Sequence, residues 1–158
     1  MPVYMLRHEK RYNSISFDTE LTSSGHLDAE TKITENVENL NIDVIYSSPF
    51  IRTLQTIKPY CIKHNIKVNV DNSLAESLPS SYKIPDEFND IINDEYKSLN
   101  QGFSDKLFDF DLVRQRTCIF LNSLDTMKNI LLVTHLPIII IMLNQDIKVH
   151  PGQILQLI

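Results

Sequence analysis

Two histidines and two arginines follow short apolar runs of the 158-residue chain. Arg7 and His8 come directly after the first run, and His135 comes after four aliphatic residues and a threonine. Arg52 lies one helical turn beyond another run, at a helix N-terminus that favours an anion. Two forked guanidinium groups, two imidazoles and a helix N-terminus predict a site for a compact dianion such as phosphate.

These residue types also predict phosphoryl chemistry that uses no metal ion. An imidazole held next to a bound phosphoryl group can act as a nucleophile and form a covalent intermediate. Glu76, in the loop after the predicted third strand, is the best placed carboxyl group to protonate the leaving oxygen. The sequence has none of the His, Cys or Glu spacings typical of metal sites, so we expect no metal and no other cofactor.

Strands that alternate with helices would position these residues. The predicted strands are residues 3–6, 44–46, 67–70, 130–133 and 153–158. The alternation predicts an α/β three-layer sandwich with a mostly parallel central sheet. Because ligands bind outside the carboxyl ends of strands in such sheets, the residues that follow the strands would meet at one edge.

Four helices are predicted from apolar periodicity and capping residues. The first has Thr22 as N-cap, ends at Asn41 and has an apolar face of Leu27, Ile33, Val37 and Leu40. Pro49 opens the second, which buries Ile62 and kinks or restarts at Pro59. A third runs from 107 to 127 with Met127 on its apolar stripe, and Pro137 starts the last.

Residues 1–158 are expected to form one domain, with an irregular insertion or lid at about 79–106. The chain has 15 Lys and Arg against 20 Asp and Glu, a formal charge of −5. This balance argues against nucleic-acid binding, which needs a cationic face. Cys61 and Cys118 fall among apolar neighbours and are predicted to be buried, reduced thiols.

The longest apolar stretch is interrupted by His135 and Pro137 and is too short to span a membrane. The first residues reach a charge too early for a signal peptide. We therefore expect a cytoplasmic protein without membrane attachment, and the sequence leaves its oligomeric state open.

Five segments resemble, in order and spacing, the motifs of one known family. They are Leu6-Arg7-His8, the Leu-Thr-x-x-Gly-x-x-x-Ala segment 21–29, the Ser-x-x-x-Arg-x-x-Gln-Thr segment 48–56, Leu74-Ala75-Glu76 and Val133-Thr134-His135. Together they are similar to the histidine phosphatase superfamily, whose fold is called phosphoglycerate mutase-like. The resemblance extends over nearly the whole chain.

By this resemblance, His8 is the nucleophile that accepts the phosphoryl group and Glu76 is the proton donor. Arg7, Arg52 and His135 bind the phosphoryl group and stabilise its charge in the transition state. The resemblance thus implies a metal-independent phosphomonoester hydrolase that forms a phosphohistidine. Its substrate would be a small phosphorylated compound or a phosphoprotein.

The segment after His8 departs from the family pattern. A small residue, commonly Gly, usually follows the nucleophile, but Glu9 takes that place here. Asn13 matches a family Asn one position early and is a further phosphate-binding candidate. A loop shortened in this way would turn Glu9 toward the phosphate. Lys10 and Arg11 either line the pocket mouth or are solvated loop residues.

Two other functions stay open at this point. A phosphoglycerate mutase would use the same phosphohistidine, but family mutases are longer, and no second cluster of basic residues for a carboxylate is evident. A catalytically inactive domain would only bind a phospho-ligand or a partner protein. The missing small residue after His8 favours this second alternative.

Overall fold

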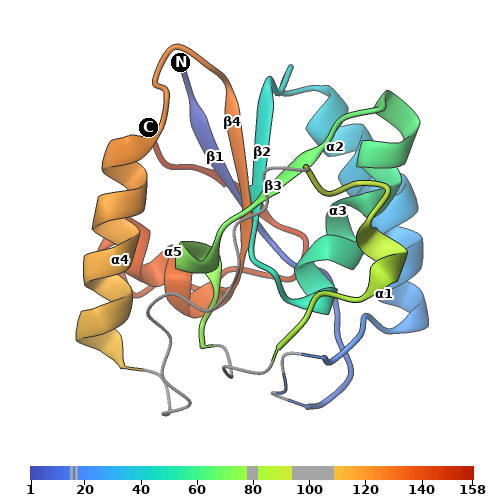
Figure 1. The fold of residues 1–158 in the computed structure, drawn as a ribbon, viewed down its shortest axis with the longest axis horizontal. Coiled ribbons are helices and arrows are strands. Elements are labelled where there is room, and N and C mark those ends of the chain that lie inside the picture. Colours follow the sequence, from blue (N-terminus) through green and yellow to red (C-terminus); the bar gives the residue numbers. More distant parts are fainter. Residues whose placement is uncertain (15, 17, 78–81, 94–108) are drawn as a thin grey trace.

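A five-stranded sheet organises the chain, of which this computed structural model describes residues 1–14, 16, 18–77, 82–93 and 109–158. The strand order is β3-β2-β4-β1-β5 (Figure 1). The strands are β1 (Val3–Arg7), β2 (Val44–Ser47), β3 (Val68–Val70), β4 (Ile130–Thr134) and β5 (Ile154–Gln156). All neighbouring pairs are parallel except β5, which runs antiparallel to β1. The predicted mostly parallel sheet is confirmed.

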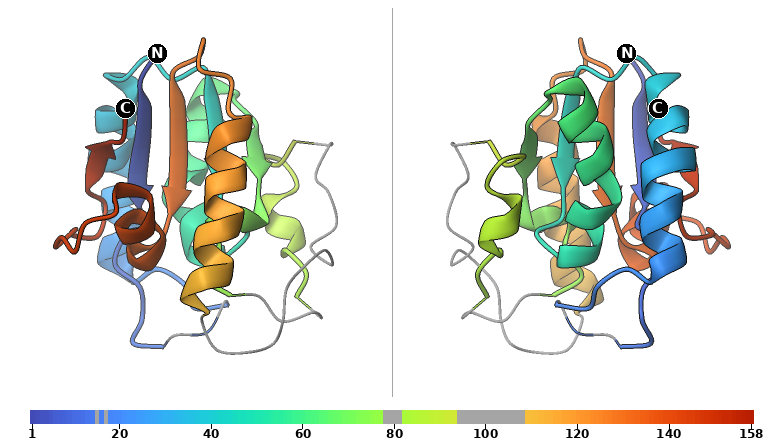
Figure 2. Two further views of the ribbon diagram at one scale, coloured as in Figure 1. Left: turned by 90° about the vertical axis from the view of Figure 1, so that its left-hand side faces the viewer. Right: turned by 90° about the vertical axis from the view of Figure 1, so that its right-hand side faces the viewer.

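Helices cover both faces of this sheet. The helical segments are α1 (Ser23–Asp28), the π-helical η1 (Ala29–Ile33), α2 (Thr34–Glu38), α3 (Ile51–His64), the short 3₁₀ turns η2 (Asn72–Leu74) and η3 (Asp86–Phe88), α4 (Phe110–Ser123) and α5 (Leu136–Leu143). In Figures 1 and 2, α4 and α5 lie on one face, and α1, α2 and α3 lie on the other. The three-layer α/β sandwich is therefore confirmed.

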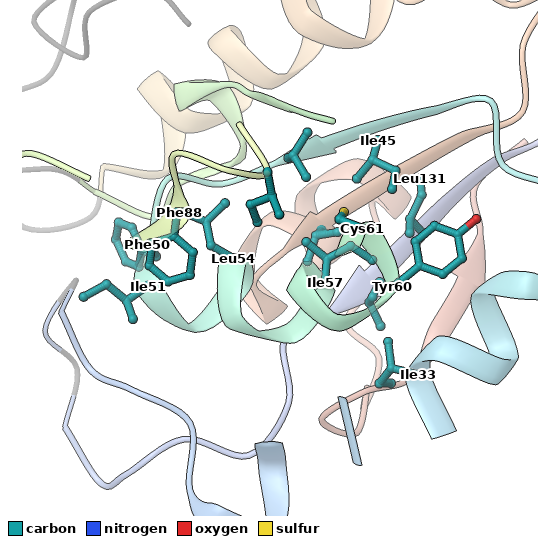
Figure 3. Close-up of a cluster of buried hydrophobic side chains, with 14 of the residues drawn as sticks. Ile33, Ile45, Phe50, Ile51, Leu54, Ile57, Tyr60, Cys61, Phe88 and Leu131 are labelled. Atoms are coloured by element: carbon teal, nitrogen blue, oxygen red, sulfur yellow. The ribbon is translucent and has the colours of Figure 1, made fainter. Parts of the chain in front are cut away.

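Strand alternation gives each face its own apolar core. In β4, Leu131 and Val133 face the α3 side, whereas Ile130 and Leu132 face the α4 and α5 side. Every β4 side chain is buried, and its first four residues are aliphatic, as a sheet covered on both faces requires. Figure 3 shows how α3 packs its apolar side chains against the sheet residues Ile45 and Leu131.

The register of the strands places the predicted functional residues side by side. Arg7 pairs with Thr134 across β1 and β4, so the residues that follow, His8 and His135, leave the same edge of the sheet. Ser47 pairs with Val133, which brings the start of α3 to that edge as well. In Figure 1 the loops that follow these strand ends gather below the sheet.

The first helical region runs without a break through α1, η1 and α2, but it ends earlier than predicted. Thr22 is its N-cap, as expected, because its side chain accepts a hydrogen bond from the Gly25 N–H. The region ends at Glu38, and Asn41 beyond it adopts the left-handed conformation with φ of 51°.

The second helix begins later than predicted. Pro49 does not open α3, because Ser48 Oγ accepts a hydrogen bond from the Phe50 N–H at 3.3 Å and Phe50 stays extended. The helix then continues through Pro59 to His64, so it does not restart there.

The structure confirms the third helix over a shorter range than the predicted 107–127. The side chain of Asp109 caps α4 by accepting from two backbone N–H groups, and the helix ends at Ser123. Residues 107 and 108 lie outside the described part of the chain. Met127 lies beyond the helix and is exposed, so its predicted place on the apolar stripe is wrong. The final strand is likewise confined to Ile154–Gln156.

Three predicted buried side chains are exposed instead. Leu27, Ile62 and Cys118 each lie on the side of a helix opposite its buried residues. The helical period places them there. The predictions were wrong because they used the apolar residue type without its position around the helix. Cys61 is buried and both cysteines are free thiols, as expected.

The predicted insertion at about 79–106 is described only for residues 82–93. That part contributes Tyr82, Ile84, Phe88 and Ile91 to the core beside α3 and β3. The Tyr82 hydroxyl donates a hydrogen bond to the Pro49 carbonyl at 2.6 Å.

Among the described residues, no helix is long and apolar enough to cross a membrane.

Candidate active site

The ends of β1 and β4 bring the two predicted site histidines together. The ring centroids of His8 and His135 lie 5.4 Å apart. Arg52 and Glu76 approach the same place, from the first turn of α3 and from the loop after η2. These four side chains come from four separate segments of the sequence, as expected for a site at the carboxyl edge of the sheet.

His8 is held so that one ring nitrogen faces away from its anchor. Its Nδ1 lies 2.7 Å from the Glu9 carbonyl oxygen. Because a carbonyl only accepts hydrogen bonds, Nδ1 carries the proton and Nε2 of the neutral ring keeps its lone pair. Burial above all, together with the charges of Arg52, Arg7 and Arg11 and against the Glu9 hydrogen bond, lowers the pKa of His8 to about 3. His8 is therefore neutral at ordinary pH and available as a nucleophile.

His135 is held by a hydrogen bond at one ring nitrogen. The side chain is completely buried, and its Nε2 lies 2.8 Å from Ser48 Oγ. Its Nδ1 lies 3.4 Å from Glu76 Oε1, and the Phe50 ring packs edge-on at 4.7 Å between centroids. Burial, followed by the charge of Arg52, holds the pKa of His135 well below its usual value.

The buried Arg52 guanidinium lies beside the half-buried carboxyl group of Glu76. Arg52 is only 1% exposed, and its Nη2 lies 3.9 Å from Glu76 Oε1. The guanidinium also donates to the Ser16 carbonyl at 2.8 Å and lies 4.6 Å from the centre of the Phe50 ring. Burial raises the pKa of Glu76, while Arg52 acts in the opposite direction. A carboxyl group in this setting holds its proton to higher pH than a solvated one.

Arg7 and Asn13 line a cavity of about 250 Å³ together with His8. Arg7 Nη1 donates a hydrogen bond to the Val149 carbonyl, which fixes the guanidinium at the cavity wall. The remaining lining residues are Glu9, Lys10, Arg11 and Pro151. The cavity is therefore rich in cationic groups around the neutral ring of His8.

Glu9 lines this cavity too, and its carboxyl group packs against Gly152. A Cβ added to Gly152 would lie 1.9 Å from Glu9 Oε1, which places the carboxyl group against the turn before β5. Glu9 Oε2 accepts a hydrogen bond from the Lys10 N–H at 3.2 Å. The charges that act on its pKa come from Asp28, Lys10 and Lys32, and burial raises that pKa.

Several motif residues support the loop after His8 instead of reaching the cavity. Thr56 Oγ1 accepts from the Glu9 N–H at 3.0 Å, and Gln55 Oε1 accepts from the Leu21 N–H at 2.8 Å. Gly25 leaves room for the same loop, because a Cβ there would lie 2.3 Å from the Lys10 carbonyl oxygen. These motif residues thus fix the segment that follows His8.

Sequence reasoning missed the residues that hold the Glu76 loop and orient His135. Arg116 of α4 donates to the Ala75 carbonyl and, at 3.3 Å, to the Glu76 carbonyl. Thr134 Oγ1 donates to the Leu74 carbonyl at 2.7 Å. The buried Ser48 contacts His135 directly. Ser48 and Thr134 lie within the motif segments named above, which could have indicated such a role.

Comparison with known proteins gives one family and a large set of similar structures. Residues 3–157 match the family model of the histidine phosphatase superfamily (branch 1). The search of curated proteins found no match.

Solved structures that resemble the chain include three phosphatases. A mycobacterial glucosyl-3-phosphoglycerate phosphatase has a TM-score of 0.71 and 17% identity, covering 98% of this chain and 90% of that one. The ecdysone phosphate phosphatase of Bombix mori has a TM-score of 0.69 and 15% identity, covering 97% of this chain and 87% of that one. The phosphoserine phosphatase of Entamoeba histolytica has a TM-score of 0.66 and 19% identity, covering 98% of this chain and 89% of that one. At these identities the likeness shows the fold.

Proposed function

The chain belongs to the histidine phosphatase superfamily, and on that basis we propose that it is a metal-independent phosphomonoesterase that forms a phosphohistidine at His8. The family and the phosphatases among the structural neighbours support a phosphatase-type activity. The observation that carries the proposal is the neutral His8 ring, anchored through Nδ1 and bordered by Arg7, in a cavity beside Arg52 and His135.

In the first step the lone pair of His8 Nε2 attacks phosphorus opposite the leaving oxygen. The nitrogen–phosphorus bond forms as the phosphorus–oxygen bond of the ester breaks. Glu76 gives its proton to the departing alkoxide, which leaves as the alcohol. Arg7, Arg52 and His135 stabilise the charge that spreads over the phosphoryl oxygens.

In the second step water releases the phosphoryl group. The Glu76 carboxylate takes a proton from the attacking water, by microscopic reversibility with the first step. The phosphorus–oxygen bond forms as the nitrogen–phosphorus bond breaks, and inorganic phosphate leaves. His8 returns to its neutral state and Glu76 to its protonated one.

Small phosphorylated compounds are the proposed substrates, with Asn13 as a further phosphate ligand. The named neighbours include phosphatases of phosphoserine and of glucosyl-3-phosphoglycerate, which supports this class. A cytoplasmic location, a single domain over 1–158 and action on phosphoproteins stay predictions.

The test is hydrolysis of p-nitrophenyl phosphate in excess EDTA by the native chain and by His8→Ala. We expect activity that survives the chelator and is lost in the variant, together with a phosphoenzyme that mass spectrometry at alkaline pH locates on His8. Transfer of the phosphoryl group to a phosphoglycerate instead of water would favour the mutase. Tight phosphate binding by a folded protein without turnover would favour the inactive binding domain.

A further inference from the structure

The turn before β5, residues 149–153, holds the backbone of the segment that carries His8. The Arg7 N–H donates a hydrogen bond to the Gln153 carbonyl at 3.1 Å. The Gly152 N–H donates to the Arg7 carbonyl at 3.0 Å and lies 3.3 Å from the His8 carbonyl oxygen. The proposed reaction uses no residue of this turn, although the turn contacts the nucleophile's own backbone.

The side chain of Glu9 fits this turn by size. Glu9 is only 3% exposed. A Cβ on Gly152 would lie 1.9 Å from Glu9 Oε1 and 2.7 Å from its Cδ, and Gly152 has a φ of 74°. Only glycine combines this left-handed conformation with the space that the carboxyl group fills. The large residue that follows His8 is thus matched by the missing side chain of Gly152.

Glu9 also supplies the carbonyl that anchors the nucleophile. That oxygen accepts from His8 Nδ1 at 2.7 Å. The N–H of Glu9 donates to Thr56 Oγ1 at 3.0 Å, and its Oε2 accepts from the Lys10 N–H at 3.2 Å. Because the N–H and the carboxyl group of one residue are both held, the direction of its carbonyl is held as well.

An ion pair does not hold the Glu9 carboxyl group. Within the part of the chain that the structure describes, Glu9 forms no salt bridge. The charged groups that act on it are Asp28, Lys10 and Lys32. The Asp28 carboxylate is shared, since each of its oxygens lies 3.3 Å from one of the two lysine Nζ atoms. Packing and a backbone hydrogen bond therefore set the place of the Glu9 side chain.

We propose that Glu9 is a positioning residue whose side chain, packed against Gly152, directs its own carbonyl at His8 Nδ1. The hydrogen bond at one ring nitrogen decides which nitrogen carries the proton. Glu9 and Gly152 together thus keep the proton on Nδ1 and the lone pair of Nε2 toward the cavity. The inference rests on the proposed function, and it assigns a role to the residue that stands where the family commonly has Gly.

The first test reads the tautomer of His8 without any need for activity. NMR spectra that correlate the ring hydrogens and nitrogens of histidine distinguish the two neutral tautomers, and His8→Asn assigns the His8 signals. We expect the native chain to carry the proton on Nδ1 alone and Glu9→Ala to show both tautomers. Glu9→Gln keeps the size and the acceptor for the Lys10 N–H, so it should retain the single tautomer.

Asp28→Asn is the matched control for these spectra. It removes a carboxylate next to Glu9 whose partners are Lys10 and Lys32 and not the turn. We expect no change in the His8 tautomer. Thermal unfolding of every variant sets a temperature at which all are folded, so that loss of structure does not enter the comparison.

The second test measures the rate of phosphoenzyme formation by rapid quench with p-nitrophenyl phosphate. We expect Glu9→Ala to slow this step about 10–100-fold, because the attacking nitrogen is misplaced. The Kd for inorganic phosphate should change less than about threefold, since Arg7, Arg52 and His135 remain. Gly152→Ala should slow the step similarly by displacing the carboxyl group. The double variant should be only slightly slower than Gly152→Ala, because coupled losses do not add.

Three results would overturn the proposal. They are a single Nδ1-protonated tautomer in Glu9→Ala, losses of rate that multiply in the double variant, and a Glu9→Gln variant as impaired as Glu9→Ala. A native chain that forms no phosphoenzyme would contradict the proposed function instead, and the tautomer spectra would still decide the role of Glu9.

Discussion

The ends of β1 and β4 carry the same residue type at adjacent positions of the sheet, yet they hold it in different ways. Arg7 of β1 and Thr134 of β4 are register partners, and each is followed by a histidine. His8 borders a cavity and has one anchored nitrogen. His135 is fully buried, with Ser48 at one nitrogen and Glu76 near the other.

This difference indicates that the surroundings of each ring, and not residue type, separate the proposed roles: the unbonded nitrogen of His8 borders a cavity, and that of His135 is buried beside Glu76. An imidazole can attack phosphorus only through a nitrogen whose lone pair is free. The Glu9 carbonyl leaves Nε2 of His8 in that state. Ser48 engages Nε2 of His135, and its Nδ1 is buried 3.4 Å from Glu76 without a hydrogen bond, which suits an imidazole that supports charge and orients its neighbours.

The largest effect should come from replacing each histidine in turn. We expect His8→Asn to reduce kcat/KM by at least about 10⁴-fold and to abolish the phosphoenzyme, because the attacking lone pair is lost. We expect His135→Asn to cost about 10²–10³-fold while a phosphoenzyme still forms. Rapid-quench labelling with radioactive substrate measures both quantities.

Thermal unfolding of both variants is the control, since both side chains are buried. Equal losses with no phosphoenzyme in either folded variant would contradict the separation of roles. A phosphoenzyme in His8→Asn would place the nucleophile elsewhere.

The next largest effect should come from Glu76, whose carboxyl group lies beside His135 and Arg52. We expect Glu76→Gln to slow hydrolysis of an alkyl phosphate about 10²–10⁴-fold. A good leaving group needs no proton, so the activated ester 2,4-dinitrophenyl phosphate should be much less affected. The slope of log kcat/KM against leaving-group pKa measures this difference, and an unchanged slope would exclude Glu76 as the acid.

The pH profile gives a second check on Glu76. Burial raises its pKa, so the protonated acid persists to higher pH than usual, and kcat/KM for alkyl phosphates should fall as pH rises through that pKa. The lower limit is the His8 pKa of about 3, below which Nε2 binds a proton. The fall in kcat/KM at high pH should disappear in Glu76→Gln.

The stability of the fold should also depend on pH, because the pKa of His8 is lowered in the folded state. The free energy of unfolding should fall as pH drops from 6.5 toward 3, so unfolding is measured at each pH.

A smaller effect on the dependence of kcat/KM on leaving-group pKa should come from Arg116, which we expect to act as a positioning residue. Its guanidinium holds the carbonyls of Ala75 and Glu76. Arg116→Met should therefore misplace the acid and cost about 10–100-fold on alkyl phosphates, with less loss on an activated ester. Arg114→Met is the matched control, since Arg114 lies on the exposed side of α4 and contacts Phe110. Equal losses on both substrate types would indicate a structural role only.

The strand ends and the residues after them could be predicted from the sequence for a physical reason. Parallel strands covered on both faces are uniformly apolar, so a polar residue marks the point where the chain leaves the sheet. Arg7, His8 and His135 stand at such points, and the structure brings them together with Arg52 and Glu76.

The supporting contacts could not be predicted, because they depend on distances between elements that periodicity does not encode. Arg116 reaches the Glu76 loop from a helix 40 positions later. Glu9 packs against Gly152, at the far end of the chain. The predicted burial of Leu27 and Cys118 was wrong for a related reason. Both side chains are apolar, but the helical period places them on the solvent side of their helices.

The smallest expected effect tests how His135 is held, through the hydroxyl of Ser48. This oxygen lies 2.8 Å from His135 Nε2 and accepts from the Phe50 N–H. Ser48→Ala would leave a buried ring nitrogen without its partner, which costs about 1–3 kcal/mol of stability. We expect kcat/KM to fall about 10-fold because the ring is then free to rotate.

Ser47→Ala is the matched control for that variant. Ser47 is equally buried and donates to the Ser48 carbonyl at 2.9 Å, but it makes no hydrogen bond to His135. It should lose stability with little change in kcat/KM measured well below the unfolding temperature. If both variants lose activity alike, the Ser48 hydroxyl stabilises only the turn into α3, and the buried environment alone orients His135. A selective loss in Ser48→Ala would show that the contrast between the two strand ends depends on this single hydrogen bond.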